Sequence, residues 1–219
     1  MHYDRLTPLP SLQSSELNPC PLFWESLPRL SSHGNLSAYK AKQKIDFPPD
    51  ELFLICRGIV QLVTAHPNGN ETVLGLAAST SLVGIPLTKV DPYWAVALTD
   101  ILILPLSWAD IEASPLLAGV LFQNILQRLQ QSETWLAIAG KRQVEERLRY
   151  MLLLLAQEFG ESLDSQTIEL KLSWTHQQLA NAIGSTRVTV TRLINQFKAE
   201  GWLNNQYRRW SIRSFSRAS

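Results

Sequence analysis

Cysteine is scarce in this sequence, and long apolar runs are absent. Cys20 and Cys56 are the only cysteines among 219 residues, too few for a disulfide framework or for a four-thiolate iron–sulfur or zinc site. No apolar run reaches the roughly 18 residues of a membrane span, and the first 20 residues lack a basic segment followed by an apolar stretch. We therefore expect a cytoplasmic protein without membrane contact and without thiolate-based sensing.

The net charge of +1 conceals an uneven distribution along the chain. Residues 1–140 carry 8 Lys+Arg against 12 Asp+Glu, whereas residues 141–219 carry 12 against 7. This asymmetry suggests a nucleic-acid-facing C-terminal part, although a solvated charged face is the more common cause of such a bias.

Between residues 41 and 106, strand-length apolar or alternating runs are separated by turn residues. They include "LFLICRG", "IVQLVTAH", "YWAVALTD" and "ILILPL", which together predict a small antiparallel sandwich or barrel. The Asn-Gly pair in "HPNGN" predicts a hairpin. Residues 1–40 are rich in Pro and Ser, and only a short helix over residues 21–30 is suggested there.

From residue 107 to 140 the apolar period lengthens to three or four residues. The pattern predicts one long amphipathic helix, whose seam comprises Leu121, Ile125, Leu129, Ser132, Leu136 and Ala139. The seam fits pairing with a second copy of the chain, and it fits packing on the chain's own sandwich equally well.

The C-terminal part reads as a helix over residues 142–158 ending at Gly160, a strand in "TIELKLS", two helices, and two short strands around an Asn-rich turn. The helices "THQQLANAI" and "TRVTVTRLINQFKAEG" flank the turn "GS". Ala180, Gly184, Val190 and Leu193 provide the small, flexible and apolar residues that a helix-turn-helix requires. Thr175 is the expected N-cap of the first helix, and Ser185 or Thr186 that of the second.

The second helix divides into two faces. Val190, Leu193, Ile194 and Phe197 form the expected buried face, and the opposite face carries Arg187, Val188, Thr191, Arg192 and Asn195. An arginine can bond bidentately to guanine, whereas Val188 can only touch a thymine methyl. We expect Arg208, Arg209 and Lys198 to bind backbone phosphates of the nucleic acid. A helical pair with a solvated basic face, or a protein-binding module, is the alternative.

On these residues, above all "IGSTRVTVTRLI", the sequence resembles the CRP/FNR family of bacterial transcription regulators over nearly its whole length. Val188 makes this stretch similar to the cyanobacterial nitrogen-control branch. The resemblance implies an α+β fold in which residues 1–112 form a cupin-like double-stranded β-helix sensor similar to a cyclic-nucleotide-binding domain. Residues 113–140 would then be a dimerisation helix and residues 141–219 a winged helix-turn-helix.

The resemblance also implies a homodimer that binds palindromic double-stranded DNA with GTA and TAC half-sites about 10 bp apart, with RNA polymerase as a further partner. The residues it places on DNA are Thr175, Gln177, Ser185, Thr186, Arg187, Val188, Thr189, Thr191, Arg192 and Arg208.

The sensor half departs from the family's effector patterns. A cyclic-nucleotide pocket of this family has a Gly-Glu pair and an Arg, but here Ile85 follows Gly84 and no Arg lies between Gly84 and Leu106, so we do not expect cAMP or cGMP to bind. The nitrogen-control branch implies 2-oxoglutarate as effector. Its matching positions are the loop residues Gly84, Ile85 and Leu87, together with Arg128 and Glu133 on the long helix.

A second arginine that would clamp the other carboxylate is missing, since Pro92 or Tyr93 stands near its place. We therefore expect a degenerate or altered pocket, with a working 2-oxoglutarate sensor as the alternative. Arg128 could instead form a salt bridge across a dimer seam.

A cupin-like enzyme is the remaining alternative. Such an enzyme needs two or three metal-binding His with a carboxylate on its strands. Between residues 41 and 106 there is only His66, so we expect neither an enzyme nor a metal site.

Overall fold

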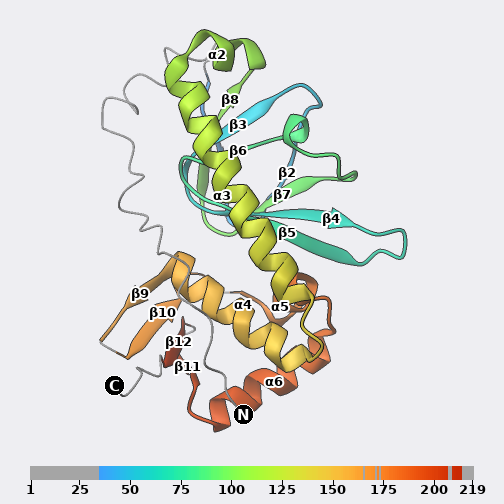
Figure 1. Ribbon diagram of the computed structural model, residues 1–219, viewed down its shortest axis with the longest axis vertical. Helices are drawn as coiled ribbons and strands as arrows, with labels where there is room; N and C mark the ends of the chain where they lie inside the picture. Colours follow the sequence, from blue (N-terminus) through green and yellow to red (C-terminus); the bar gives the residue numbers. More distant parts are fainter. Residues whose placement is uncertain (1–34, 165, 171, 173, 207–208, 214–219) are drawn as a thin grey trace.

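The computed structural model describes residues 35–164, 166–170, 172, 174–206 and 209–213. The helix suggested over residues 21–30 lies outside them. The described chain forms a strand-rich N-terminal half and a mixed C-terminal half, with one long helix running beside the first and reaching the second (Figure 1).

The N-terminal half is a roll of two four-stranded antiparallel sheets. The strands of the first, in spatial order, are β1 (Ser37–Tyr39), β8 (Ile101–Leu106), β3 (Leu52–Arg57) and β6 (Leu82–Val83). Those of the second are β2 (Lys44–Asp46), β7 (Trp94–Ala97), β4 (Val60–Ala65) and β5 (Glu71–Ala77). Apolar residues from both sheets, such as Ile55, Leu62 and Ile103, pack between them. The predicted antiparallel sandwich is confirmed.

The predicted hairpin at "HPNGN" joins β4 to β5. Gly69 adopts φ 80°, and the amide of His66 donates to the carbonyl of Asn70 at 2.8 Å. Further along, the register shifts between Leu62 and Val63, so that Leu74 is an extra residue on β5. Such a bulge changes the direction of the strand's side chains.

The long amphipathic helix is broken near its start, so the prediction of a single helix is wrong there. Helix α2 (Trp108–Ala113) and helix α3 (Pro115–Ala139) are separated by Ser114, which is extended at φ −124° and ψ 105°. A residue before proline is sterically disfavoured in the α-helical region, whereas proline itself suits the first position of a helix.

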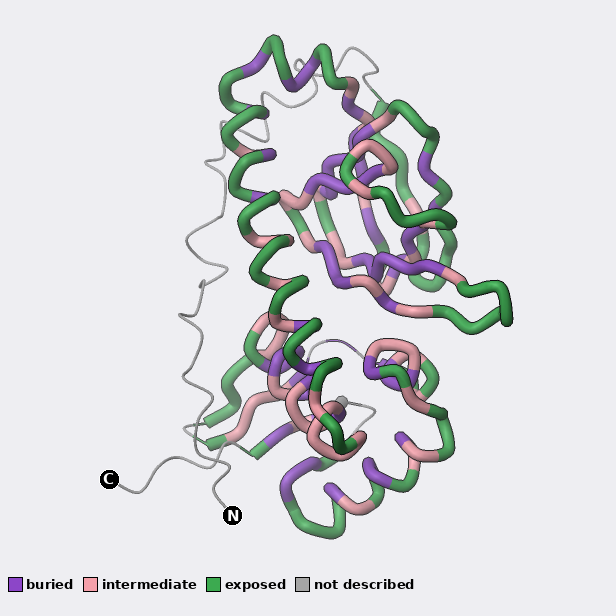
Figure 2. Tube along the Cα trace, turned by 45° about the vertical axis from the view of Figure 1, so that its right-hand side comes forward, coloured by how far each residue is buried: buried purple, intermediate pink, exposed green. Residues whose placement is uncertain are grey.

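Helix α3 buries only part of its apolar surface within the chain. Leu117, Trp135 and Ile138 are buried, whereas Leu129 is 54% and Leu136 73% exposed. Figure 2 shows buried segments lining the inside of the roll and exposed ones along much of α3. The predicted seam is therefore divided between the chain's own roll and solvent.

The C-terminal half contains three helices and a four-stranded sheet in the order β11-β12-β10-β9. Its elements are α4 (Val144–Phe159), β9 (Gly160–Ser162), β10 (Thr167–Leu170), α5 (His176–Ile183), α6 (Arg187–Ala199), β11 (Leu203–Gln206) and β12 (Arg209–Arg213).

One prediction for this half needs correction. Asn204 and Asn205, expected in a turn, lie within β11, and residues 207–208 lie outside the described chain. Gly160 ends α4 as predicted, and at φ −88° it is not in the left-handed conformation typical of such glycines. Glycine is needed there because a Cβ would clash with the carbonyl oxygen of Ala156.

One hydrophobic cluster contains residues from both halves of the chain. Val73 and Leu76 of β5 join a cluster that includes Leu179, Ile194 and Phe197 of the C-terminal helices. In the described part of the chain, no helix combines the length and apolarity needed to cross a membrane.

Candidate functional site

Helices α5 and α6 form a helix-turn-helix whose ends are fixed by side-chain caps. The Thr175 hydroxyl accepts from the Gln178 amide at 3.1 Å, and the Gln178 side chain accepts from the Thr175 amide at 2.9 Å, forming a capping box. Gly184 ends α5 at φ 60°, in the left-handed conformation. Thr186 caps α6 by accepting from the Thr189 amide at 3.2 Å. The predicted cap at Thr175 is confirmed, and Thr186 is the second cap.

Helix α6 exposes the face that the sequence assigned to DNA. Val190, Leu193, Ile194 and Phe197 are buried as predicted. On the other side Val188 is 79% exposed, and the Arg187 and Arg192 side chains are exposed as well. Neither guanidinium has an ion-pair partner among the described residues. Two cations and one methyl-bearing side chain are thus presented to solvent on a helix whose inner face is fixed.

The other candidate DNA residues have various local contacts. Thr175, Gln177 and Thr186 are exposed, and Gln177 donates to the Asn181 side chain at 2.7 Å. Ser185 is half-buried, and Thr189 contacts the Thr186 hydroxyl at 2.9 Å. Arg208 lies outside the described residues.

Thr191 is held by a link between the two helices that sequence reasoning missed. Its hydroxyl donates to the Arg187 carbonyl at 2.8 Å and lies 2.8 Å from Nδ1 of His176. Burial, followed by the charges of Lys198 and Arg187, lowers the pKa of His176. A neutral imidazole is therefore favoured here, and it joins the start of α5 to the middle of α6.

Helix α4 clamps the helix-turn-helix from behind. Arg149 bonds to the Glu200 carboxylate at 2.9 Å and stacks over the rings of Phe197 and Trp202, at 4.3 and 4.5 Å. Arg147 donates to the carbonyl of Ile183 at 2.9 Å. Glu200 is the single acidic residue between positions 187 and 217, and its pairing with Arg149 leaves the basic surface of α6 without a free carboxylate.

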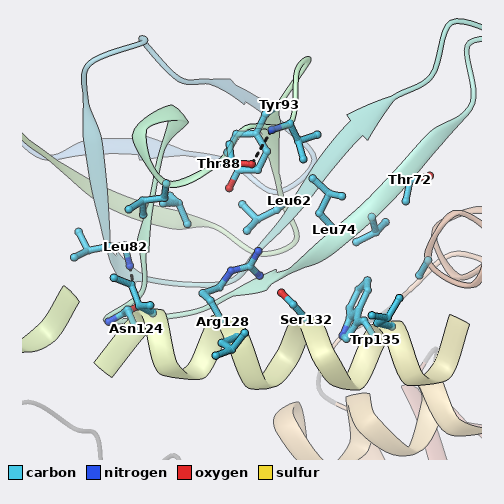
Figure 3. A pocket seen from close by; sticks show the side chains of 18 of the residues that line it. Leu62, Thr72, Leu74, Leu82, Thr88, Tyr93, Asn124, Arg128, Ser132 and Trp135 are labelled. Carbon is cyan, nitrogen blue, oxygen red and sulfur yellow. Dashed lines mark hydrogen bonds between the residues drawn. The ribbon is translucent and has the colours of Figure 1, made fainter. Parts of the chain in front are cut away.

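A second candidate site lies between the roll and α3, where a cavity of about 780 Å³ opens (Figure 3). Its walls are mostly apolar. They include Leu62, Leu74, Leu82, Val83, Leu87, Leu121, Ile125 and Trp135, with Thr72, Thr88, Tyr93, Asn124, Arg128 and Ser132 as the polar members.

Arg128 extends from α3 toward β5 in this cavity. A Cβ on Gly75 would clash with Nη1 of Arg128 and meet Oε1 of Gln131 at 2.5 Å, so glycine provides the space that the guanidinium occupies. Nη1 donates to Oε1 of Gln131 at 2.8 Å. Burial lowers the pKa of Arg128, while Tyr93 and Glu158 act to raise it. An arginine nonetheless keeps its charge in a protein.

Gln131 connects the cavity to both halves of the chain. Besides the Arg128 bond, its Oε1 accepts from the Leu76 amide of β5 at 3.0 Å, and its Nε2 donates to Glu158 of α4 at 3.2 Å. Burial raises the pKa of Glu158 to about 7, partly offset by the Gln131 bond and the Arg128 charge.

The comparisons with known proteins decide the family. The Crp-like helix-turn-helix domain matches residues 146–217. The "Global nitrogen regulator" of Synechococcus elongatus is 34% identical over 161 residues, covering 69% of this chain and 72% of that protein. Its counterpart from a Nostoc strain is 32% identical over 176 residues, covering 74% and 78%. The chain belongs to the CRP/FNR family of transcription regulators.

Solved structures agree with this fold. A CRP/FNR-family regulator from Thermus thermophilus superposes with a TM-score of 0.66 at 24% identity, covering 81% of this chain and 93% of that one. A mutant of CooA from Carboxydothermus hydrogenoformans superposes with a TM-score of 0.70 at 20% identity, covering 95% of this chain and 93% of that one. The predicted fold class and the relation to the nitrogen-control branch are confirmed.

In this CRP/FNR regulator, the candidate effector residues occupy different places. Leu87 and Arg128 line the cavity, and so does Tyr93, near the position of the missing arginine. Gly84 lies against the backbone, where a Cβ would meet the Glu51 carbonyl at 2.5 Å, and Ile85 packs on the roll core. Neither belongs to the described lining of the cavity. Glu133 is exposed on α3 and is likewise not among the lining residues.

Sequence reasoning missed several residues that shape this cavity. Gly75 interrupts the strand run "ETVLGLA", and an isolated glycine in a strand is a signal of a bulge or a close approach. Asn124 is 5% exposed; it accepts from the Leu82 amide at 2.9 Å and donates to the carbonyls of Thr80 and Val120 at 2.8 and 2.9 Å. A polar residue on an apolar helix face was its only signal.

The described residues contain no group of three or more His, Cys, Asp or Glu that could hold a metal. Burial raises the pKa of the Cys56 thiol to about 11. At neutral pH this thiol is therefore uncharged and unreactive.

Proposed function

We propose that this CRP/FNR regulator binds, as a homodimer, a palindrome with GTA and TAC half-sites, inserting α6 of each protomer into a major groove. The observation that carries the proposal is the set of exposed residues Arg187, Val188 and Arg192 on a helix whose opposite face is locked by packing. The arginines suit guanine and Val188 suits a thymine methyl. The net charge of +5 over residues 141–219 adds sequence-independent attraction to phosphates.

The division of labour follows the halves of the chain. Residues 1–112 are the sensor, residues 113–140 the dimerisation helix and residues 141–219 the DNA-binding part. Ile125, Leu129 and Leu136 on α3 are half or more exposed in the single chain. Pairing two copies of α3 would remove these side chains from water, and burial of apolar area favours association.

The effector site is altered from the nitrogen-control pattern. Arg128 is the one cation among the described lining residues, and Tyr93 provides only a neutral hydroxyl on the facing wall. A second carboxylate of 2-oxoglutarate would lack a cation, and cAMP would lack the family's Gly-Glu pair. A working 2-oxoglutarate sensor is the second candidate, favoured by the cationic Arg128 within the cavity.

Regulation then works through the relative rotation of two paired α3 helices. A ligand held between the roll and α3 would favour one rotation and thereby set the spacing of the two α6 helices, shifting a population between two dimer geometries. The protein acts in the cytoplasm on promoter DNA with RNA polymerase as partner, and it has no catalytic role.

The palindrome's geometry provides the test. Two half-sites one helical turn apart face the same side of the duplex, and adding about 5 bp turns one of them to the opposite side. Fluorescence anisotropy should show tight binding at the native spacing and a loss of at least about tenfold for the 5-bp insertion. Equal binding to both duplexes would contradict a two-fold dimer. Adding 2-oxoglutarate in the same titration should leave the affinity unchanged, and tighter binding would favour the second candidate.

A further inference from the structure

The polar groups of the cavity are mostly committed to the protein itself. Asn124 uses its oxygen and both amide hydrogens on backbone groups. The Thr88 hydroxyl accepts from the Val90 amide at 3.1 Å, and the Thr72 hydroxyl lies 2.9 Å from Nε2 of His66. Arg128, Tyr93 and Ser132 remain as the polar lining residues available to a ligand, and the indole N–H of the lining residue Trp135, although buried, also has no hydrogen-bond partner in the described chain.

Arg128 has bonding capacity to spare. Of its five N–H donors, Nη1 alone makes a hydrogen bond to another described residue, the one to Gln131. It forms no ion pair within the described chain, and the described lining of the cavity contains no carboxylate. A guanidinium placed at an apolar wall without a directly bonded carboxylate favours binding one negative charge.

Tyr93 faces Arg128 from the opposite wall of the cavity (Figure 3). Its hydroxyl makes no hydrogen bond to any residue that the structure describes, and burial raises its pKa, so it stays protonated and can donate. A ligand head group between the two side chains would accept charge-assisted hydrogen bonds from Arg128 and a neutral hydrogen bond from the Tyr93 hydroxyl.

Beyond these groups the walls are mostly apolar. Leu62, Leu74 and Leu82 of the roll face Leu121 of α3 across the space. A cavity of about 780 Å³ lies within the range of pockets that enclose drug-sized ligands. A short dicarboxylate would fill little of it and would leave its second charge against leucines.

We propose that this cavity binds a monocarboxylate with an apolar body, its carboxylate held by Arg128 and Tyr93 and its chain or ring lying along the leucines of the roll and α3. The inference rests on the proposed function for the cavity's role as effector site, and it replaces a polar dianion with an amphiphilic monoanion as the ligand class.

Isothermal titration calorimetry on the full chain without DNA tests the head group and the body separately. Octanoate, octan-1-ol and suberate share an eight-carbon chain but carry one, no and two carboxylates, and 2-oxoglutarate is the polar comparison. We expect one octanoate per chain, bound at least about tenfold more tightly than the other three, since charged hydrogen bonds contribute this much. Octan-1-ol or suberate binding as tightly as octanoate, or 2-oxoglutarate binding more tightly, would overturn the proposal.

Variants identify the site. Arg128→Gln should bring octanoate down to the affinity of octan-1-ol, whereas Arg57→Gln, at an exposed position at the end of β3, should change nothing. Tyr93→Phe keeps the ring and should weaken octanoate a few fold with octan-1-ol unaffected. It carries the test if Arg128→Gln does not fold. Retained octanoate preference in both variants would contradict the assignment.

The outcomes for DNA and for ligand are independent. No octanoate binding by a protein that still binds its palindrome would overturn this inference and leave the proposed function standing. Octanoate binding by a protein that shows no sequence preference on DNA would do the reverse.

Discussion

At the scale of residues, Arg187 and Arg128 have the same side chain in opposite surroundings. Arg187 projects into solvent from α6 with no described carboxylate beside it, whereas Arg128 is enclosed over Gly75 and bonded to Gln131 at 2.8 Å. Exposure lets the first approach a flat, hydrated partner such as a base edge. Burial favours the binding of an anion to Arg128, since an unpaired charge costs more free energy away from water.

Replacing Arg187 with Ala should abolish most of the sequence preference. A bidentate arginine–guanine pair contributes about 1–3 kcal/mol of discrimination, so the affinity ratio between palindrome and scrambled duplex should fall at least about fivefold. Arg57→Ala, with the same charge change in the sensor half, is the matched control. An unchanged ratio for Arg187→Ala, with dimer and fold intact, would show that Arg187 does not read bases.

Glu158 gives the stability a pH dependence. Burial raises its pKa from 4.5 to about 7, so across this window the folded protein holds a proton that the unfolded chain has released. Stability therefore falls as the pH rises from about 5 to 7, by on the order of 1–3 kcal/mol. Glu158→Gln should remove this part of the pH dependence in chemical denaturation and be the more stable form at pH 8. If the free energy of unfolding changed with pH in the same way in both proteins, Glu158 would not be the source of this pH dependence.

The residues predicted correctly are those set by local rules. The Thr175 cap and the buried face through Val190, Leu193 and Phe197 follow from helix geometry within a few residues. Gly75 was missed because the group that needs its missing side chain, Arg128, comes from a helix later in the chain. A glycine in a strand shows that space is needed without showing for what.

At the scale of elements, α3 carries most of the architecture. It covers the roll with Leu117 and Leu121, lines the cavity with Arg128 and exposes Leu136. Its overall position was predictable from the three-to-four-residue period. We did not predict the break at Ser114 from the sequence, although the steric effect of Pro115 on the preceding residue explains it.

Asn124 should fix α3 to the roll. Its side chain bonds the Leu82 amide and the Thr80 carbonyl, and Asn124→Ala would leave these groups unpaired at a buried position. We expect a loss of about 1–3 kcal/mol in the free energy of unfolding, measured by urea denaturation. Gln130→Ala, at an exposed position of the same helix, is the control. Equal stability of both variants would mean that the bonds contribute nothing net.

At the scale of the whole molecule, the order of the parts was predictable and their docking was not. Periodicity and turn residues gave a strand-rich half, a long helix and a helix-turn-helix in sequence order. The contacts between halves join residues far apart in the chain, such as the bond from Gln178 of α5 to Gln61 of β4 at 3.2 Å. The shared core through Val73 and Leu76 has the same non-local origin.

The exposed apolar surface of α3 should make the chain dimeric. Leu129→Lys combined with Leu136→Lys would place two charges on each copy of the proposed interface, and like charges repel in a closed pair. Sedimentation velocity should then show monomers, and palindrome binding should weaken at least about tenfold because one half-site is lost. Gln130→Lys at an exposed polar position should remain dimeric. A dimeric double variant would place the interface elsewhere.

The most direct test of sequence-specific DNA binding is fluorescence anisotropy with a labelled GTA/TAC palindrome and a scrambled duplex of the same composition, across a series of salt concentrations. We expect the affinity for both duplexes to fall as salt rises, since phosphate contacts release counter-ions. The palindrome should stay at least about a thousandfold tighter throughout. Equal affinities at every salt concentration would contradict the assignment of α6 as the helix that reads DNA sequence.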